Sequence, residues 1–271
     1  MTGIAFIGGG NMASSIIGGL IEQGERSAKL IEVAEPNPAQ RDLLEKQFQV
    51  NTHTEGLQAI ARADVVILAV KPQVAKDVLM PLQATLQKNQ PLLISIAAGI
   101  DIASLSQWSG CRAIVRAMPN TPALLREGAT GLYANKQVSQ EQRDLADSLL
   151  RAVGLTVWVG SEDKINAVTA LSGSGPAYFF LLMEAMIDAA VNLGLTRQAA
   201  TDLCLQTAQG AGKMARQSDV EVAELRRRVT SPGGTTEQAI TSFEQANLRG
   251  IVSQALQAAH QRAIELSQSK D

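Results

Sequence analysis

A glycine-rich turn between a strand and a helix is the feature that most constrains what this chain can fold into. The run GIAFIG (3–8) predicts a strand, and NMASSIIGGLIEQG (11–24) predicts a helix that ends at a glycine. Between them, Gly8, Gly10 and Ala13 match the pattern G-x-G-x-x-A. The three positions serve a tight turn, close approach to a pyrophosphate and close helix–strand packing. Because the motif lies inside a βαβ unit, it predicts a dinucleotide-binding domain.

Short apolar runs alternate with helical patterns through the first part of the chain. Further strands are predicted at 30–35, 63–70, 91–99, 111–120, 128–134 and 155–160, and further helices near 38–48, from Pro72 and near 139–153. Strands written as continuous Val, Ile and Leu runs are typical of a parallel sheet covered on both faces. The alternation therefore predicts an α/β, Rossmann-type doubly wound domain, which we assign to residues 1–161.

The remainder, residues 162–271, is predicted to be an all-α domain. No strand is expected after Glu162, and helical patterns rich in Ala, Gln and Leu fill the rest. The most apolar stretch (176–195) is long enough to suggest a membrane span, but Glu184, Asp188 and Asn192 give it one polar stripe. We interpret it as a helix that is buried on most sides, either in a soluble protein or in an oligomer. These helices are more apolar than a lone domain of this size needs, so we expect the domain to dimerise.

Composition and rare residue types exclude several classes of function. Charged residues are 18% of the chain and the net charge is −2, and the run Arg226–Arg228 is interpreted as a solvated helix face, so no nucleic-acid partner is expected. Cys111 and Cys204 are expected to be buried free thiols, which fits a reducing cytoplasm. His53 and His260 have no metal-ligand companions, so no metal site is expected. No secretory signal precedes the first strand, so we expect a cytoplasmic protein without a membrane anchor.

The cofactor is predicted to lie along the carboxyl ends of the strands. Glu35 ends the second strand, where an acidic residue usually bonds the ribose hydroxyls and repels a 2′-phosphate. This favours NADH, but Asn37 and Arg41 could instead meet a phosphate, so the choice between NADH and NADPH stays open. Lys71 is placed to contact the nicotinamide side. The predicted cofactor residues are Ile7, Gly8, Gly9, Gly10, Asn11, Met12, Glu35, Ala69, Val70, Lys71, Pro72 and Ala97.

A second glycine-rich stretch, VTSPGGTTEQAI (229–240), predicts an anion site at a helix start. The helix is expected to begin at Thr235, and Thr235 and Gln238 have the spacing of a capping box. Free N–H groups at a helix start favour a negative charge. LSGSGPAYFF (171–180), with Pro176 in the first turn, is another glycine-rich helix opening. Two such openings in one helical domain suggest a small pocket.

At this point the sequence resembles the pyrroline-5-carboxylate reductase family over its whole length. The resemblance rests on IGGGNMA (7–13), AVKP (69–72), SIAAG (95–99), RAMPNTPALLREG (116–128), AVTALSGSGPAY (167–178) and, above all, ELRRRVTSPGGTTEQAI (224–240). It implies reduction of the ring C=N of 1-pyrroline-5-carboxylate to L-proline, the last step of proline biosynthesis, with NADPH or NADH. It also implies a helical domain that interlocks with a second subunit, and in several members a ring of five dimers.

The resemblance implies roles for the residues of the second glycine-rich stretch. The backbone N–H groups of Gly234, Thr235 and Thr236 would hold the substrate carboxylate, with help from the Ser231 hydroxyl. The Thr236 hydroxyl would face the ring nitrogen, which makes Thr236 the one catalytic candidate. Asp219 aligns loosely with an acidic residue near the substrate in the family.

The implied mechanism requires little acid–base chemistry from the protein. Hydride passes from the nicotinamide to carbon C5 of the protonated imine. No histidine lies in the motifs and no carboxylate lies in the loop, so we expect proximity in a dry cleft to supply the rate. One departure from the family is Gly56, preceded by Glu55, at a position where several members have an asparagine that contacts the adenosine ribose.

Three rival functions remain to be weighed. A reductase of β-hydroxy acids would need a lysine just after a glycine-rich helix start, and residues 171–186 contain none. A reductase of a six-membered cyclic imine differs by one methylene, worth only about 1–3 kcal/mol in a pocket. A nucleotide sensor would not need the SPGGTT loop. The sequence leaves ring size, dimer or decamer, and feedback by proline open.

Overall fold

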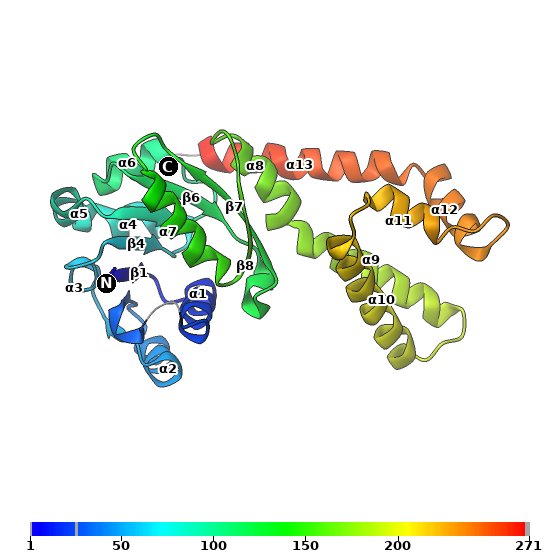
Figure 1. The fold of residues 1–271 in the computed structure, drawn as a ribbon, viewed down its shortest axis with the longest axis horizontal. Coiled ribbons are helices and arrows are strands. Elements are labelled where there is room, and N and C mark those ends of the chain that lie inside the picture. The colour runs from blue at the N-terminus through cyan, green and yellow to red at the C-terminus, as the bar shows by residue number, and fades with distance from the viewer. Residues whose placement is uncertain (1, 25–26, 269–271) are drawn as a thin grey trace. The chain divides into compact units, whose positions relative to one another are not determined.

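The computed structural model describes residues 2–24 and 27–268 and divides into two compact units (Figure 1). The first unit contains residues 1–174 together with 259–271, and the second contains residues 175–258. In this division the last described turns of the chain, from residue 259, belong to the first unit. We keep the division at 161/162, which follows the change from α/β to helical sequence, as a proposal.

The first unit is built on one eight-stranded sheet. Its strands are β1 (Ile4–Ile7), β2 (Ile31–Ala34), β3 (Asn51–His53), β4 (Val65–Leu68), β5 (Leu92–Ser95), β6 (Ile114–Met118), β7 (Gly128–Ala134) and β8 (Gly154–Trp158). Their order is β3-β2-β1-β4-β5-β6-β7-β8, and every neighbouring pair is parallel except β6 and β7. The order reverses between β1 and β4, as in a Rossmann-type doubly wound sheet. The predicted fold class is confirmed.

Helices cover both faces of this sheet. They are α1 (Asn11–Glu22), α2 (Pro38–Phe48), α3 (Gly56–Ile60), α4 (Pro72–Leu79), α5 (Gln83–Asn89), α6 (Ile102–Ser109) and α7 (Gln140–Arg151), with short 3₁₀ turns at Ala28–Leu30, Met80–Leu82 and Thr121–Leu125. Ile4 and Phe6 pack with residues of α1, α2 and α7, whereas Ala5 and Ile7 pack with residues of α3 to α6. Because both faces are buried, alternation along the strand gives no polar face, and the strands are continuous apolar runs.

Local sequence signals account for where several helices begin. The Asn37 Oδ1 accepts a hydrogen bond from the Ala39 N–H at 3.0 Å, and Pro38 is the first residue of α2. Ser139 and Gln142 form a reciprocal capping box at the start of α7. The strand β3 was not predicted, because Asn51, Thr52 and His53 form a short polar strand at the sheet edge without an apolar run.

The second unit is helical throughout its described residues, as predicted. Helix α8 (Lys164–Val168) and a π-helical segment (Thr169–Gly173) still belong to the first unit. The second unit contains α9 (Gly175–Asn192), α10 (Arg197–Gln217), α11 (Val222–Arg228), α12 (Thr235–Gln245) and the first half of α13 (Leu248–Gln268). Helix α10 packs against α9, where the Cys204 thiol donates to the Met183 carbonyl at 3.7 Å. Ala200 and Cys204 on α10 are buried. Both Cys111 and Cys204 are free and buried, as expected.

Many large apolar side chains of the second unit are exposed in the single chain. Examples are Phe179, Phe180 and Leu181 on α9, Leu203 on α10 and Ile251 on α13, each more than half exposed. The continuous helix Lys164–Asn192 is also long and apolar enough to span a membrane by length and composition alone. Exposed apolar area on this scale marks a surface that is covered by another chain or by lipid.

Candidate active site

The turn between β1 and α1 has the geometry that its glycines predict. Gly8 has a φ of +98°, and a Cβ there would lie 2.6 Å from the Ala69 carbonyl oxygen. Gly10 is the N-cap of α1, and a Cβ there would meet no atom within 4 Å. Ala13 is buried against the sheet. Gly8 is therefore required by the fold, whereas the open space at Gly10 is available to a ligand.

The start of α1 offers hydrogen-bond donors to that space. Within the described part of the chain, the N–H groups of Asn11 and Met12 have no acceptor, as is usual in the first turn of a helix. The positive end of the helix dipole adds to the attraction of an anion. Donors and space together fit the pyrophosphate of a nicotinamide dinucleotide.

Glu35 is fixed at the end of β2 by backbone donors. Its Oε2 accepts the Gly9 N–H and its Oε1 accepts the Asn37 N–H, both at 2.9 Å. One Arg41 nitrogen, Nη1, donates to the carbonyls of Glu35 and Pro36 at 2.8 and 3.0 Å. The carboxylate thus lies beside the glycine turn, where the acidic residue of a dinucleotide fold meets the ribose.

The remaining predicted cofactor residues lie on the same edge of the sheet. Ala69 follows β4 and donates its N–H to the Ile7 carbonyl at 2.8 Å, and Pro72 is the first residue of α4. Lys71, the N-cap of α4, is exposed, and Ala97 follows β5. Since β1, β2, β4 and β5 are parallel neighbours, their carboxyl ends form one continuous border. The structure therefore brings together the residues that the sequence predicted for the cofactor.

Ile7 and Gly56 are both packed closely against the core. The Ile7 side chain is 2% exposed and belongs to the core beneath α3 to α6, so only its backbone can face a ligand. Gly56 begins α3, and a Cβ there would lie 2.9 Å from the Leu82 side chain. The departure from the family at residue 56 thus coincides with close packing of α3 on the core.

In the second unit, the loop before α12 forms a tight turn. The Gly234 N–H donates to the Ser231 carbonyl at 3.0 Å, and Gly233 has a φ of +71°. The Gly233 N–H donates to the Glu237 carboxylate at 2.8 Å. Two of the loop's N–H groups are therefore already engaged inside the turn.

The capping box predicted between Thr235 and Gln238 is wrong. The N-cap is Gly234, which has no side chain to cap with, and Thr235 is already the first helical residue. Glu237, three residues after the true N-cap, reaches back to the loop instead. Among the residues that the structure describes, the N–H groups of Thr235 and Thr236 have no acceptor, and both residues are exposed. Helix α12 consequently begins with open donors at Thr235 and Thr236.

The other glycine-rich stretch is not an open helix start. Helix α9 begins at Gly175 with Pro176 second, as predicted, but the π-helical segment runs directly into it. The Ser174 N–H donates to the Thr169 carbonyl at 2.9 Å, which is an i to i+5 bond. The Asn120 side chain donates to the Ser172 carbonyl at 2.9 Å. Sequence reasoning quoted the motif that contains Asn120 but assigned it no role.

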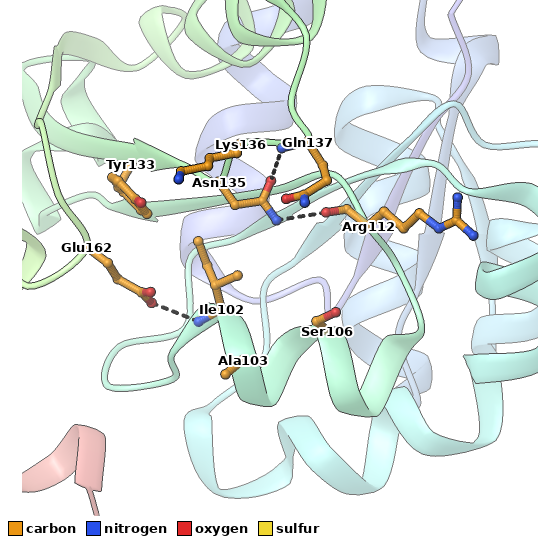
Figure 2. Close-up of a pocket in the computed structure, with 9 residues that line it drawn as sticks. All are labelled: Ile102, Ala103, Ser106, Arg112, Tyr133, Asn135, Lys136, Gln137 and Glu162. Atoms are coloured by element: carbon orange, nitrogen blue, oxygen red, sulfur yellow. Dashed lines mark hydrogen bonds between the residues drawn. The ribbon is translucent and has the colours of Figure 1, made fainter.

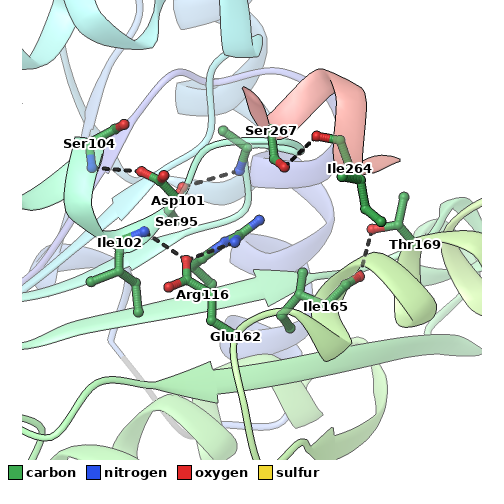
Figure 3. A network of polar contacts seen from close by, with 11 residues as sticks. Ser95, Asp101, Ile102, Ser104, Arg116, Glu162, Ile165, Thr169, Ile264 and Ser267 are labelled. Carbon is green, nitrogen blue, oxygen red and sulfur yellow. Dashed lines mark hydrogen bonds and ion pairs between the residues drawn. The ribbon is translucent and has the colours of Figure 1, made fainter. Parts of the chain in front are cut away.

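An ion pair between buried Arg116 and half-buried Glu162 joins the segment before α8 to the sheet (Figure 3). Arg116, on β6, is 5% exposed, and its Nη1 lies 2.8 Å from Glu162 Oε1. The same oxygen accepts the Ile102 N–H at 2.7 Å, at the start of α6. Breaking such a pair by removing one partner leaves a buried charge uncompensated. The pair therefore fixes the chain that leads into α8.

A surface pocket of about 550 Å³ lies beside Ile102 and Glu162 (Figure 2). Its lining residues are Ile102, Ala103, Ser106, Arg112, Tyr133, Asn135, Lys136, Gln137 and Glu162. None of them is a predicted cofactor or substrate residue. We assign the pocket no role in the reaction.

Comparison with known proteins decides the family. Residues 162–266 match the family model described as pyrroline-5-carboxylate reductase dimerisation, and residues 3–99 match NADP oxidoreductase coenzyme F420-dependent. A pyrroline-5-carboxylate reductase of Pseudomonas aeruginosa is 55% identical over 266 residues, which cover 98% of this chain and 97% of that protein. The chain belongs to the pyrroline-5-carboxylate reductase family. The Haemophilus influenzae reductase is 44% identical, with 97% of each chain covered.

Solved structures of the pyrroline-5-carboxylate reductase family share the fold. The structure of the Coxiella burnetii reductase matches with a TM-score of 0.95 at 48% identity and covers 99% of both chains. The Plasmodium falciparum reductase, solved with NADP bound, matches with a TM-score of 0.85 at 30% identity and covers 98% of both chains. The predicted two-part fold and the predicted class, an NAD(P)H-dependent oxidoreductase with a dimerisation domain, are confirmed. The roles of individual residues stay predictions.

Proposed function

We propose that this protein reduces 1-pyrroline-5-carboxylate to L-proline by hydride transfer from NAD(P)H. The observation that carries the proposal is the likeness to reductases of that name over 98% of the chain. The site geometry agrees with it, because the chain combines a dinucleotide turn with a helix start that has open donors. A nucleotide sensor would not need the second feature, and a β-hydroxy acid reductase would need a lysine that residues 171–186 lack.

The cofactor contacts proposed here follow from the sheet edge. The open space at Gly10 and the N–H groups of Asn11 and Met12 would hold the pyrophosphate. Glu35 would accept the ribose hydroxyls, and Ala69 to Pro72 with Ala97 would border the nicotinamide. The bound cofactor supplies the hydride. The Glu35 carboxylate favours NADH over NADPH, because a 2′-phosphate would bring negative charge beside it.

The substrate carboxylate is proposed to bind at the start of α12. A carboxylate removed from water must have its charge met by hydrogen bonds, and charge-assisted bonds are the strong ones. The N–H groups of Thr235 and Thr236 are open donors, whereas the Gly234 N–H is already bonded to Ser231. We therefore assign the substrate carboxylate to the N–H groups of Thr235 and Thr236. The Ser231 hydroxyl would assist, and Gly234, which has no side chain, would leave room for the carboxylate. The Thr236 hydroxyl would orient the ring nitrogen.

The protein's contribution to the chemical step is then mainly proximity. The Glu237 carboxylate, which belongs to α12, already accepts the Gly233 N–H, and we assign it no proton transfer. The imine is protonated from solution or by a water. Holding two reactants in a near-attack geometry supplies several kcal/mol of the barrier, roughly 7–11 in well-oriented cases.

The donor assignment can be tested by a change that removes one N–H and little else. In Thr235→Pro the N–H is lost, but proline is well tolerated at the first position of a helix and Gly234 before it is extended. We expect the KM for 1-pyrroline-5-carboxylate to rise at least about tenfold, the value of one hydrogen bond to a charged group. Steady-state kinetics at saturating NADH measures it.

Thr235→Ala is the matched control, because it keeps the N–H and removes only the side chain. Its KM should stay within about threefold of the parent value. An unchanged KM in folded Thr235→Pro would place the carboxylate elsewhere. Equal rises in both variants would assign the effect to the side chain.

The finer assembly and location are part of the proposal. Homodimers that associate as a ring of five are proposed on the family resemblance alone. A cytoplasmic protein without nucleic-acid or membrane partners is proposed from the free cysteines and the biosynthetic role of its relatives. The exposed apolar faces of the second unit would then be covered by the partner subunit.

A further inference from the structure

We propose that Asn120 is a positioning residue of the active site, which fixes the π-helical segment Thr169–Gly173 at the carboxyl end of β6. The inference rests on the proposed function. Asn120 is 9% exposed and follows β6 by two residues. Its Oδ1 accepts the Ala129 N–H at 2.8 Å, and its Nδ2 donates to the Ser172 carbonyl at 2.9 Å. One side chain thus joins the start of β7 to the π-helical segment.

The Ser172 carbonyl needs this donor because of a proline. In an α-helix the carbonyl of residue 172 would accept the N–H of residue 176, but Pro176 has none and its ring crowds that carbonyl. The chain responds with a π-helical segment, in which Ser174 bonds to Thr169. The Ser172 and Thr169 hydroxyls bond back to Val168 and Ile165, which also loosens the helix. Asn120 supplies the donor that the proline removes.

The place of this contact links it to the reaction. Gly173 lies close to the Met118 side chain, the last residue of β6. Strands β4, β5 and β6 are parallel neighbours, so Asn120 lies on the edge that also carries Ala69 and Ala97. Ligands of open α/β sheets bind outside the carboxyl ends of the strands. The contact therefore lies at the edge of the sheet where the nicotinamide is proposed to bind.

A second asparagine makes an equivalent bridge at the opposite edge of the sheet. Asn135 follows β7 and donates from Nδ2 to the Arg112 carbonyl at 2.7 Å (Figure 2). It also accepts the Ile114 N–H at 3.3 Å. Each asparagine side chain donates one hydrogen bond to a main-chain carbonyl and accepts at least one from a main-chain N–H. Only Asn120 lies at the ligand edge. Asn135 is therefore a control for the loss of a bridging amide.

The experiment compares Asn120→Asp with Asn135→Asp in the full-length protein. At neutral pH each aspartate keeps an acceptor but loses the donor to one carbonyl. We expect Asn120→Asp to lower kcat at least about tenfold, because displaced reacting groups lose rate steeply. The Kd of NADH should stay within about twofold, since the contacts at Gly10 and Glu35 are untouched. Asn135→Asp should lower the melting temperature without lowering kcat more than about twofold.

Several outcomes would overturn the inference. An unchanged kcat in folded Asn120→Asp, or an equal fall in Asn135→Asp, would make Asn120 a structural residue only. Turnover by the parent protein and by Asn135→Asp tests the proposed function independently. If neither reduces 1-pyrroline-5-carboxylate, the proposed function fails, and the inference falls with it for that separate reason.

Pro176→Ala provides a second test that does not depend on the stability of one variant. It restores an N–H four residues after Ser172, so the carbonyl no longer depends on Asn120. Asn120→Asp should therefore lower kcat by a smaller factor in the Pro176→Ala background than in the parent protein. A double-mutant cycle measures this coupling. An equal fall in kcat in both backgrounds would show that Asn120 does not act through its bond to Ser172. If Asn120→Asp does not fold alone, the double variant is expected to fold and to turn over; failure of both to fold would overturn the proposed rescue.

Discussion

At the scale of the residue, Gly8 and Gly10 lie in the same turn, but different physical constraints require glycine at the two positions. Gly8 has a left-handed φ and backbone atoms where a Cβ would lie, whereas Gly10 has ordinary extended geometry and empty space beside it. The first is fixed by the fold and the second by what binds there. This contrast separates structural from functional glycines without reference to any relative.

The contrast predicts different outcomes for the same substitution. Gly10→Val should fold normally and raise the Kd of NADH at least about tenfold, because its side chain occupies the space for the pyrophosphate. Gly8→Val should destabilise the domain through strain and a clash with Ala69. Thermal melting and NADH titration measure the two effects. Normal NADH binding by Gly10→Val would refute the assignment of that space.

Thr236 is predicted to orient the substrate rather than to transfer a proton. Thr236→Ala should lower kcat about tenfold, the value of roughly one hydrogen bond, without abolishing turnover. Thr235→Ala, next to it, should change kcat little. Complete loss of turnover in folded Thr236→Ala would mean that the hydroxyl takes part in proton transfer.

Sequence reasoning found the glycine turn but missed contacts between distant segments. Gly8 and Gly10 were recognisable because the fingerprint is local, continuous and flanked by a strand and a helix. The Asn120–Ser172 bond joins residues 52 positions apart, and no local pattern announces it. The cap of α12 was misassigned by one residue, because Thr235 resembles an N-cap while glycine carries no capping group to recognise.

At the scale of the element, α7 and the edge strand β8 are joined through one carboxylate. Asp147 Oδ1 accepts bonds from Thr156 Oγ1 at 2.7 Å and Trp158 Nε1 at 3.1 Å, and Arg151 binds its other oxygen. Burial raises the pKa of Asp147, but the bonds from Arg151, Thr156 and Trp158 outweigh it, so its pKa lies below the ordinary value. The ionised carboxylate therefore stabilises the folded state.

Asp147→Asn is predicted to cost about 1 kcal/mol at pH 7, the difference between a charged and a neutral acceptor. The loss corresponds to a fall in Tm of roughly 2–4 °C for a domain of this size. A depressed folded pKa contributes stability above the unfolded pKa, about 3.9, and loses it as the pH falls through the folded value. The difference between the two proteins should therefore hold from pH 7 to about pH 5 and shrink below about pH 4.

Exposed Asp144, which accepts the Gln140 side chain one turn earlier, provides the control. Asp144→Asn should leave the Tm within about 1 °C at either pH. A pH-independent difference for Asp147→Asn would show that the charge is not what stabilises β8.

The sequence predicted the start of a helix correctly where a capping residue or a proline stands at that start. Asn37 with Pro38, and Ser139 with Gln142, fixed the starts of α2 and α7. Strand β3 is held by its pairing with β2 rather than by its own apolar residues, so periodicity could not find it. The π-helical segment before α9 likewise arises from Pro176 acting together with a distant side chain.

At the scale of the whole molecule, the two units differ in how many of their apolar residues they bury. The first unit buries its apolar residues on both faces of one sheet, and the second leaves many of its own exposed. An excess of apolar helix was visible in the sequence, and the match to a dimerisation family accounts for it. Which helices meet the partner depends on geometry between chains, which no single-chain pattern encodes.

The most direct test of the account is the oxidation of NADH and of NADPH, followed optically with and without 1-pyrroline-5-carboxylate. We predict a fall in absorbance that requires the imine, with L-proline as product and a higher kcat/KM for NADH because of Glu35. A higher kcat/KM for NADPH would contradict the role of Glu35 alone. No turnover with either cofactor, by a protein that still binds both, would contradict the proposed function itself.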